Sequence, residues 1–454
     1  MCVLVSKDYV VMGAGVAGIV AAFLLAKRGC RVTLLENRPA IGGVNAGLQW
    51  NGFSLDFGCH LFGNDSDLST GVLLELMDGE VAPVDVKFAS VLHGEVTPGF
   101  ELPNLASLGP AVADRILREL LEACTLPARP AETLHDLLET RYGPTAALAL
   151  DGCLRKVFSD GAAALAPEAI QATTFRRIRV VPDELAKLLK RLEVVDDRLA
   201  QGSAADPMSF YRDKVSLYPH RSFYPASGGM AGFASRARKV LERMGVRIHT
   251  GVTLRALSLR PSAKIITDAH GEFEPEAIVW TLGLGRLEPW LGGTNNIVAS
   301  TVAVPMLLYY FDIAKEQETG MSYVNDFDLQ TRVFRASVPG SYGSGNCPPG
   351  RSYVCCEVPI STESELWQEP ARFSGQIWAE ARRLGVATGE PADVFTLKAR
   401  ESYKAPRADH FSRSADLAAA LEREPQILST REWGFSVGRT VIELTEYLKH
   451  ASAA

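Results

Sequence analysis

The hydrophobic pattern at the start of the chain changes from strand-like to helix-like and back. An apolar run at Tyr9–Met12 leads into a group of glycines, then into an apolar stretch of helical length, and then into a second apolar run at Arg31–Leu35. We therefore predict a strand, a tight turn, a helix and a second strand between residues 8 and 36. Strands that alternate with helices favour a mostly parallel sheet and an α/β fold.

The pattern changes further along the chain. Residues 105 to 205 carry Ala, Leu, Glu and Arg at helical spacing, which predicts a helical insertion. Residues 290 to 400 alternate apolar runs with turns rich in Gly, Pro and Ser, which predicts a series of strands. The longest apolar run, 297 to 311, is short for a membrane span and is rich in β-branched and aromatic residues. We expect a buried strand or strand pair there and no transmembrane segment.

Length, charge and cysteine content narrow the class of protein. A chain of 454 residues is expected to form two or three structural units. Its formal net charge of −6 argues against nucleic acid as the main partner. None of the eight cysteines forms a C-x-x-C pair, so neither zinc sites nor disulfides are expected. The chain enters its first strand without a signal-peptide pattern, and we expect a reducing, cytoplasmic location.

The glycines after the first strand form a nucleotide-binding pattern. Gly13, Gly15 and Gly18 give G-x-G-x-x-G, in which the first glycine makes the tight turn, the second admits a pyrophosphate and the third lets helix and strand pack closely. Glu36 ends the second strand, where an acid can accept hydrogen bonds from a ribose. The predicted cofactor-binding residues here also include Val16, Ala17 and Asn37. Up to Glu36 the sequence fits NAD and FAD equally well.

The following segment separates these two cofactors. "LLENRPAIGG" and then "GFSLDFGCHLF" resemble the FAD-binding signature of the flavoprotein superfamily that contains amine oxidases, phytoene desaturases, protoporphyrinogen oxidase and UDP-galactopyranose mutase. The resemblance implies that Gly42 and Gly43 place backbone amides against non-covalently bound FAD. Many relatives carry Arg after this glycine pair, whereas this chain has Val44.

The same resemblance places Asp56, Gly58 and His60 on a path that leads under the flavin ring. We predict that Asp56 and Gly58 bind the cofactor and that His60 is catalytic, since imidazole can donate to the flavin or to a substrate oxygen. Two structural alternatives stay open at this point. Asp56 can cap a turn, and His60 can be a core histidine with its hydrogen bonds satisfied.

Two later segments complete the predicted cofactor site by resemblance. "SFYPASGGMAGF" and the residues after it resemble the second signature of the superfamily, which adds Gly228, Gly229, Met230 and, against the adenine, Leu254. "EAIVWTLGL" adds Thr281 near the diphosphate. The C-terminus matches weakly: Gly438 and Arg439 resemble the start of the final helix, and Glu432 is the replacement for a missing Asp.

Other side chains are weaker predictions. Arg176, Arg177 and Arg179 can grip a phosphorylated or carboxylated substrate, although an ordinary solvated or salt-bridged face is the commoner use of such a cluster. The tyrosines of the predicted sheet are candidates for a substrate pocket, although strand aromatics more often belong to a core; they are Tyr309, Tyr310, Tyr323 and Tyr353.

The resemblance implies a Rossmann-like FAD-binding domain, with three layers around a mostly parallel sheet, and a substrate domain of mixed or antiparallel sheet. We assign residues 1–65, 218–290 and 400–454 to the first domain. Residues 66–217 and 291–399 form the second, with the helical insertion at about 105–205.

The leading functional hypothesis is an FAD-dependent oxidoreductase of biosynthesis. It takes a hydride from a small or medium organic substrate, and O₂ or another acceptor reoxidises the flavin. One alternative is a redox-neutral enzyme like UDP-galactopyranose mutase that acts on a sugar-nucleotide. Another is a flavin-binding partner protein with a degraded active site. A homodimer is left open.

Overall fold

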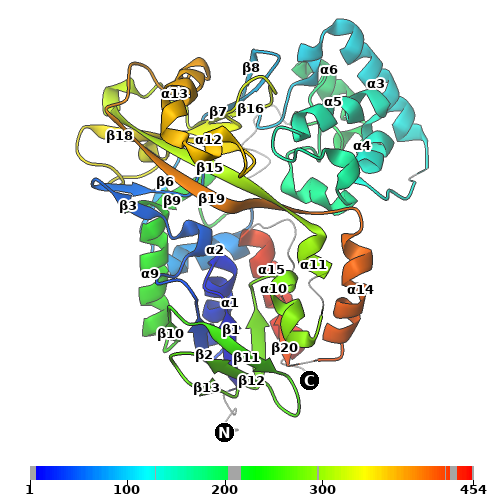
Figure 1. The fold of residues 1–454 in the computed structure, drawn as a ribbon. Coiled ribbons are helices and arrows are strands. Elements are labelled where there is room, and N and C mark those ends of the chain that lie inside the picture. Colours follow the sequence, from blue (N-terminus) through cyan, green and yellow to red (C-terminus); the bar gives the residue numbers. More distant parts are fainter. Residues whose placement is uncertain are drawn as a thin grey trace.

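A five-stranded parallel sheet forms the centre of the lower half of the molecule (Figure 1). The computed structural model describes residues 7–127, 129–202, 216–293, 296–424, 426–429 and 437–451. The strand order is β10-β2-β1-β14-β20, and every neighbouring pair is parallel. The strands are β1 (Asp8–Met12), β2 (Arg31–Leu35), β10 (Arg247–His249), β14 (Ala277–Trp280) and β20 (Ile427–Ser429).

Alternating side chains bury both faces of this sheet. Val11 and Leu34 pack against a helical layer, whereas Val10 and Leu35 pack against a small antiparallel sheet. The helices are α1 (Val16–Lys27), α2 (Asp67–Leu76), α9 (Gly229–Arg243) and α15 (Val437–Ala451). The small sheet contains β11 (Leu254–Ser258), β12 (Lys264–Thr267) and β13 (Glu272–Phe273). The predicted α/β class with three layers is confirmed.

A seven-stranded sheet forms the upper half, in the order β19-β15-β18-β17-β16-β7-β8. All its pairs are antiparallel except β16 with β7. The strands are β7 (Phe88–Leu92), β8 (Glu95–Pro98), β15 (Thr301–Ala314), β16 (Tyr323–Asp326), β17 (Arg335–Ser337), β18 (Arg351–Pro359) and β19 (Asp393–Pro406). One face packs on α12 (Glu365–Gln368) and α13 (Ser374–Arg383). The other face meets the segment that contains β3 (Leu48–Trp50) and β4 (Phe53–Leu55).

The predicted insertion is helical and lies beside the upper sheet (Figure 1). It contains α3 (Pro110–Thr125), α4 (Leu134–Tyr142), α5 (Pro144–Leu154), α6 (Asp183–Leu189) and α7 (Glu193–Asp196), which share a hydrophobic core. The remaining elements are the short β5 (Phe62–Gly63), β6 (Val81–Pro83), β9 (Ser222–Pro225), α10 (Leu284–Leu287) and α11 (Asn296–Ala299), and the longer helix α14 (His410–Leu421).

The apolar run at 297 to 311 departs from the prediction at its start. Residues 297 to 299 belong to α11, and β15 begins at Thr301. The carboxylate of Glu288 accepts hydrogen bonds from the backbone N–H groups of Asn296 and Ile297, at 2.9 and 3.0 Å. A carboxylate at this position satisfies the first N–H groups of a helix, so a helical turn replaces strand here. Within the described ranges, none of the helices combines the length and the apolarity needed to cross a bilayer.

Candidate cofactor and active site

The glycine turn between β1 and α1 contains three glycines with three different surroundings. Gly13 has φ +95°, a conformation that favours glycine. A Cβ added to Gly18 would lie 1.8 Å from the carbonyl oxygen of Gly13, so the third glycine is required for helix and strand to pack. A Cβ added to Gly15 would meet nothing within 4 Å. The second glycine therefore borders open space, where a bound group can approach the backbone.

The predicted glycine pair lies directly against this turn. Gly42 forms a parallel bridge with Gly15, and its N–H donates to the carbonyl of Ala14 at 2.7 Å. A Cβ added to Gly43 would lie 3.0 Å from the Cα of Gly15. Two segments that are far apart in the sequence thus bring bare backbone together.

Helix α1 begins at this point without a capping side chain. Gly15 is its N-cap residue, Val16 and Ala17 start its first turn, and that turn contains no acidic residue. The N–H groups at a helix N-terminus carry partial positive charge and attract anions such as diphosphate. This end of the helix is therefore suited to hold the diphosphate of a dinucleotide.

Glu36 holds the turn from the end of β2. Its buried carboxylate accepts hydrogen bonds from the N–H of Ala14 at 2.7 Å and from the N–H of Arg38 at 2.9 Å. A carboxylate has about four acceptor positions, so capacity remains for ribose hydroxyls. Glu36 thus has a structural role in addition to the predicted one.

A cavity of about 380 Å³ opens beside Gly13 and the end of β2. It brings together three of the predicted residues: Gly13, Asn37 and Leu254. The remaining lining residues were not predicted: Met12, Leu35, Val252, Thr253, Trp280, Leu282, Gly285, Arg286, Pro289 and Trp290. The Pro-Trp pair at 289–290, close after the "WTLGL" segment, was the available sequence signal for an aromatic wall.

Thr281 contacts the backbone of the glycine turn. Its hydroxyl lies 2.9 Å from the carbonyl oxygen of Met12 and 3.1 Å from that of Gly13. A Cβ added to Gly13 would lie 2.8 Å from this hydroxyl oxygen. Thr281 therefore lies beside the predicted diphosphate region but directs its hydroxyl at protein backbone.

Comparisons with known proteins match part of the chain to a nucleotide-binding domain. A family model described as an NAD(P)-binding Rossmann-like domain matches residues 11–76. Prolycopene isomerase 2 of an Oncidium hybrid cultivar is 34% identical over 101 residues, which cover 22% of this chain and 16% of that protein. All-trans-retinol 13,14-reductase of Homo sapiens is 37% identical over 92 residues, which cover 19% of this chain and 15% of that protein. The chain thus matches about a sixth of the length of these relatives.

Solved structures match along the whole chain. Reduced UDP-galactopyranose mutase has a TM-score of 0.75 at 16% identity and covers 99% of this chain and 96% of its own. A protoporphyrinogen oxidase-like protein from Exiguobacterium sp. 255-15 has a TM-score of 0.68 at 15% identity, with 98% of both chains covered. Putrescine oxidase with bound putrescine has a TM-score of 0.61 at 15% identity and covers 99% and 100%. The chain has the same fold as these solved structures. The resemblance predicted from the sequence is confirmed.

Asp56, which belongs to the "GFSLDFGCHLF" signature, is buried and forms hydrogen bonds with several other segments. Its carboxylate accepts hydrogen bonds from the N–H of Met230 at 2.9 Å and from the hydroxyl of Tyr224. Its backbone carbonyl accepts from Tyr310 at 2.7 Å, and its N–H bonds the hydroxyl oxygen of Tyr353 at 3.2 Å. Burial raises its pKa to about 7. These contacts fit the structural alternative, in which Asp56 is a capping carboxylate.

The second superfamily signature meets Asp56 directly. Gly228 and Gly229 have φ +76° and +62° and begin α9. A Cβ added to Gly229 would lie 2.9 Å from a carboxylate oxygen of Asp56, and the N–H of Gly229 donates to Asn346 at 2.9 Å. The structure therefore brings together Asp56, Gly228, Gly229 and Met230 as a tightly packed unit.

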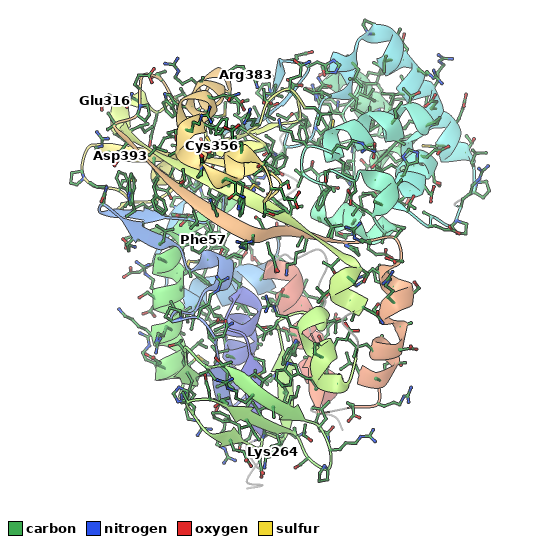
Figure 2. All side chains as sticks on the ribbon, viewed as in Figure 1. Phe57, Lys264, Glu316, Cys356, Arg383 and Asp393 are labelled. Atoms are coloured by element: carbon green, nitrogen blue, oxygen red, sulfur yellow. The ribbon has the colours of Figure 1, made fainter. Side chains whose placement is uncertain are left out.

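His60 follows Phe57 by three residues, and Figure 2 labels Phe57 at the boundary between the two halves of the molecule. Its Nε2 lies 3.1 Å from the carbonyl oxygen of Phe57, and its side chain stays partly exposed. Burial lowers its pKa, and the charge of Arg335 lowers it further against the opposite effect of Glu357. His60 is therefore neutral at neutral pH.

Sequence reasoning missed the ion pair beside this histidine. Arg335 on β17 donates to Glu357 on β18 through Nε at 2.7 Å and Nη2 at 2.8 Å. The N–H of Cys59 donates to the same carboxylate at 3.0 Å, and a Cβ added to Gly58 would lie 3.0 Å from it. Burial alone would raise the pKa of Glu357, but the Arg335 guanidinium and its hydrogen bonds hold that pKa below its usual range. No local pattern links positions so far apart, so no sequence signal was available.

The structure also places the residues of the weaker predictions. Arg176 and Arg177 are exposed, while Arg179 is mostly buried, pairs with Asp183 at 2.6 Å and lies over the Phe100 ring, which fits a solvated or salt-bridged face. The four candidate tyrosines, Tyr309, Tyr310, Tyr323 and Tyr353, are all buried. The hydroxyl of Tyr309 bonds the carbonyl of Pro370 at 2.9 Å, and that of Tyr323 bonds Glu101.

The C-terminal residues are placed in part. Gly438 is buried in α15, where an added Cβ would lie 3.3 Å from the hydroxyl oxygen of Ser69 on α2. Gly438 therefore lies where α15 packs against α2. Arg439 lies in the same helix, and Glu432 lies outside the described residues.

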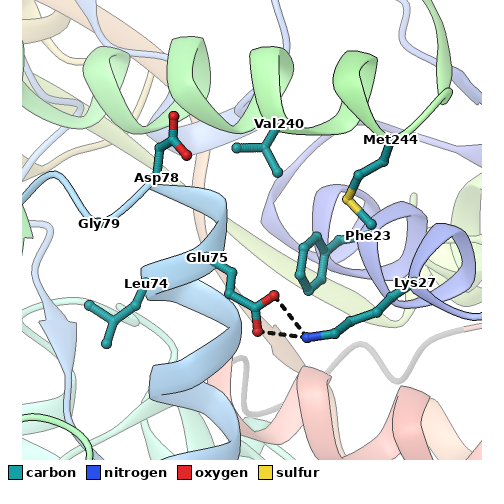
Figure 3. A pocket seen from close by; sticks show the side chains of 8 residues that line it. All are labelled: Phe23, Lys27, Leu74, Glu75, Asp78, Gly79, Val240 and Met244. Carbon is teal, nitrogen blue, oxygen red and sulfur yellow. Dashed lines mark hydrogen bonds and ion pairs between the residues drawn. The ribbon is translucent and has the colours of Figure 1, made fainter.

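A larger cavity, of about 510 Å³, lies elsewhere on the surface (Figure 3). It is lined by residues of α1, α2 and α9 and of the turns after α2 and α9: Phe23, Lys27, Leu74, Glu75, Asp78, Gly79, Val240 and Met244. Lys27, at the opposite end of α1 from the glycine turn, bonds both carboxylate oxygens of Glu75, at 2.7 and 2.8 Å. None of the predicted site residues lines it. The described residues contain no cluster of three His, Cys, Asp or Glu that could hold a metal ion.

Proposed function

We propose that the protein binds FAD without a covalent link and is an oxidoreductase that takes a hydride from a small or medium organic substrate. The open space in front of Gly15 carries this proposal. An added side chain would meet no protein atom there within 4 Å, yet the position is glycine in a chain whose neighbouring glycines are packed tightly. Bare backbone facing open space at a helix N-terminus is what a bound diphosphate requires.

The surrounding residues fit the other parts of FAD. The carboxylate of Glu36 has acceptor capacity for ribose hydroxyls, and the cavity that contains Asn37, Leu254 and Trp290 would hold the adenosine end. Gly42 and Gly43 extend the bare backbone from the diphosphate toward Asp56 and His60. Bound FAD would supply two-electron oxidation, while the chain holds, orients and desolvates the substrate.

Cys59 supports the non-covalent part of the proposal. Burial raises the pKa of its thiol to about 11, and the thiol contacts the hydroxyl of Tyr342 at 3.5 Å. A protonated thiol is a poor nucleophile toward a flavin.

The relatives with partial matches include enzymes named for redox chemistry, a retinol reductase and a 4,4'-diapophytoene desaturase. We include hydride removal in the proposal on this basis, with O₂ or another acceptor as the oxidant of the reduced flavin. A cytoplasmic location, a homodimer and the predicted domain boundaries stay predictions.

The test has two stages. The protein is first reconstituted with FAD, and the nucleotide released by denaturation is identified. The holoenzyme is then mixed anaerobically with candidate amines, polyenes, alcohols and sugar-nucleotides. We expect FAD to be released and its absorbance to bleach with a substrate, because the electrons stay on the ring. Turnover only after prior reduction, with a product isomeric to the substrate, would instead support a mutase-like enzyme. Bound FAD with neither reaction would support a partner protein with a degraded site.

A further inference from the structure

One face of the seven-stranded sheet changes from apolar to polar along a single row of paired residues. Leu397 pairs with Leu308, Leu308 with Glu357, and Glu357 with Arg335, on strands β19, β15, β18 and β17. Residues paired across neighbouring strands point to the same face. An apolar surface and an arginine–glutamate pair therefore lie side by side, on the face that meets the His60 segment.

Only some of the Arg335 guanidinium nitrogens donate hydrogen bonds to the described residues. Nε and Nη2 donate to Glu357, and Nη2 also donates to the hydroxyl of Tyr403 at 2.5 Å. Among the described residues, Nη1 has no acceptor, and the side chain is 21% exposed. Because the Glu357 carboxylate already balances the charge of Arg335, this side of the guanidinium is suited to donate to a neutral oxygen rather than to hold an anion.

The hydrogen bond of His60 fixes which of its nitrogens is free. A backbone carbonyl can only accept, so Nε2, at 3.1 Å from the Phe57 oxygen, must carry the proton. Nδ1 of the neutral ring is then an unprotonated acceptor, and the described residues offer it no donor. Arg335 thus offers a donor and His60 an acceptor, and the two residues are linked through Glu357, which Arg335 binds and which accepts from the N–H of Cys59, next to His60.

We propose that this site binds the hydroxyl group of an alcohol substrate, with Arg335 donating to its oxygen and His60 Nδ1 accepting its proton. The inference rests on the proposed function and specifies its substrate class. Leu308, Leu397 and Phe57 belong to one hydrophobic cluster beside this pair, and its partly buried members Leu397 and Phe57 would contact the hydrocarbon part of such a substrate.

The reaction balances with FAD as the oxidant. The carbinol C–H bond breaks, and its hydrogen leaves with the electron pair as a hydride to the oxidised flavin. The O–H bond also breaks, and its proton passes to His60 Nδ1. A C=O bond forms between the carbinol carbon and the oxygen. Arg335 keeps its hydrogen bond to the oxygen throughout. Glu357 is a positioning residue, because its carboxylate accepts twice from Arg335, once from the Cys59 backbone and once from the Tyr403 hydroxyl, which fills its acceptor positions.

The same contacts disfavour the two charged alternatives. A protonated amine would find no free carboxylate in the pair, since Glu357 already accepts from Arg335 and Cys59. A carboxylate would add a negative charge that no free cation of this site balances. The neutral hydroxyl is the group that needs both a donor and an acceptor.

The experiment uses the FAD holoenzyme and probes with matched carbon skeletons. FAD content is measured first, so that failure to bind FAD counts against the proposed function alone. The oxidisable probes are benzyl alcohol and cyclohexanol, and their counterparts are benzylamine and cyclohexylamine. 2-Phenyl-2-propanol and 1-methylcyclohexanol lack a carbinol hydrogen and report binding through the flavin absorbance. We expect an alcohol, and not its matched amine, to bleach the flavin under anaerobic conditions.

Two variants separate the roles of the residues. R335K keeps a positive charge beside Glu357 but loses the planar donor, so the Kd of the tertiary alcohol should rise about ten-fold, which corresponds to one hydrogen bond. H60N should leave that Kd within about two-fold but slow bleaching about 100-fold, as for a lost acid–base group, and abolish its pH dependence. R383K is the matched control, because Arg383 pairs with Asp326 at the far edge of the same half (Figure 2) and should change neither quantity.

An independent readout is the protonation of His60 itself. Long-range ¹H–¹⁵N spectra, assigned with H60N, should show a neutral ring protonated at Nε2 at neutral pH. The assignment is overturned if FAD binds but neither alcohol series perturbs the flavin, if amines bleach it while alcohols do not, or if Nδ1 carries the proton.

Discussion

One end of the proposed site consists of backbone groups, and the other end consists of side chains. Around Gly15 and Gly42, backbone approaches backbone, and the ligand-facing groups are amides and open space. Around His60 and Arg335, side chains from separate strands approach one another, and the groups are a guanidinium, a carboxylate, an imidazole and phenols.

This difference shows how each end holds its geometry. The backbone end is fixed by sterics, since glycine is required wherever a Cβ would collide with a neighbouring segment. The side-chain end is fixed by charge, since Glu357 is buried and stays ionised because Arg335 and Cys59 donate to it. Substitutions should therefore fail by crowding at one end and by unpaired charge at the other.

Removing the arginine is the most damaging change to the side-chain end. In R335M a nearly buried carboxylate loses its cation, so the free energy of unfolding should fall by about 3–5 kcal/mol. The double variant R335M/E357Q removes the orphaned charge as well and should recover most of this loss. Urea unfolding of both apoproteins measures the difference. If the single variant were as stable as the wild type, the pair would not be fixed by charge.

At the backbone end, substitutions of two glycines in the same turn are expected to have different effects. In G18A the new Cβ meets the Gly13 carbonyl, and we expect a loss of about 3 kcal/mol in stability. In G15V the side chain enters open space, so the melting temperature of the apoprotein should stay unchanged while FAD binding is abolished. Calorimetry of the apoproteins and FAD titration separate the two effects. Equal losses of stability in both variants would mean that Gly15 does not face a ligand.

The contrast also explains what could be read from the sequence. The glycine turn, β1, β2 and Glu36 were predictable because their chemistry is local: each constraint acts between residues that are close in the chain or that form a familiar pattern. Arg335, Glu357 and Tyr403 belong to three strands whose register is set by sheet packing, and nothing in the sequence pairs them. The Pro-Trp pair at 289–290 offered a local signal for an aromatic residue, but not its position at the cavity, which forms only when the segments at 37, 254 and 290 fold together.

Asp56 joins the two ends, and its titration tests that junction. Its pKa of about 7 in the folded protein exceeds the ordinary aspartate value of 3.8, because burial disfavours the charged form. This group therefore contributes stability that is full below about pH 4 and is lost as pH rises toward 7. Relative to D56N, which does not titrate, the wild type should lose about 2 kcal/mol between pH 5 and 7. Parallel stability curves for the two proteins would show that Asp56 is already ionised at pH 5.

Glu36 should give the smallest effect, and it tests whether the backbone end depends on side chains at all. In E36A the N–H groups of Ala14 and Arg38 lose their acceptor, and a bound ribose would lose one too. We expect FAD binding to weaken by about 1–2 kcal/mol while the spectrum of bound flavin stays the same, since the flavin ring is remote from this contact. E75A is the matched control, because it removes an acid from a surface ion pair with Lys27 and should leave the Kd for FAD unchanged. FMN lacks the adenosine, so its affinity should be equal in wild type and E36A if Glu36 acts on the ribose. A parallel loss of FMN affinity would instead show that Glu36 acts by shaping the turn around Ala14, and the backbone end would then depend on this one carboxylate.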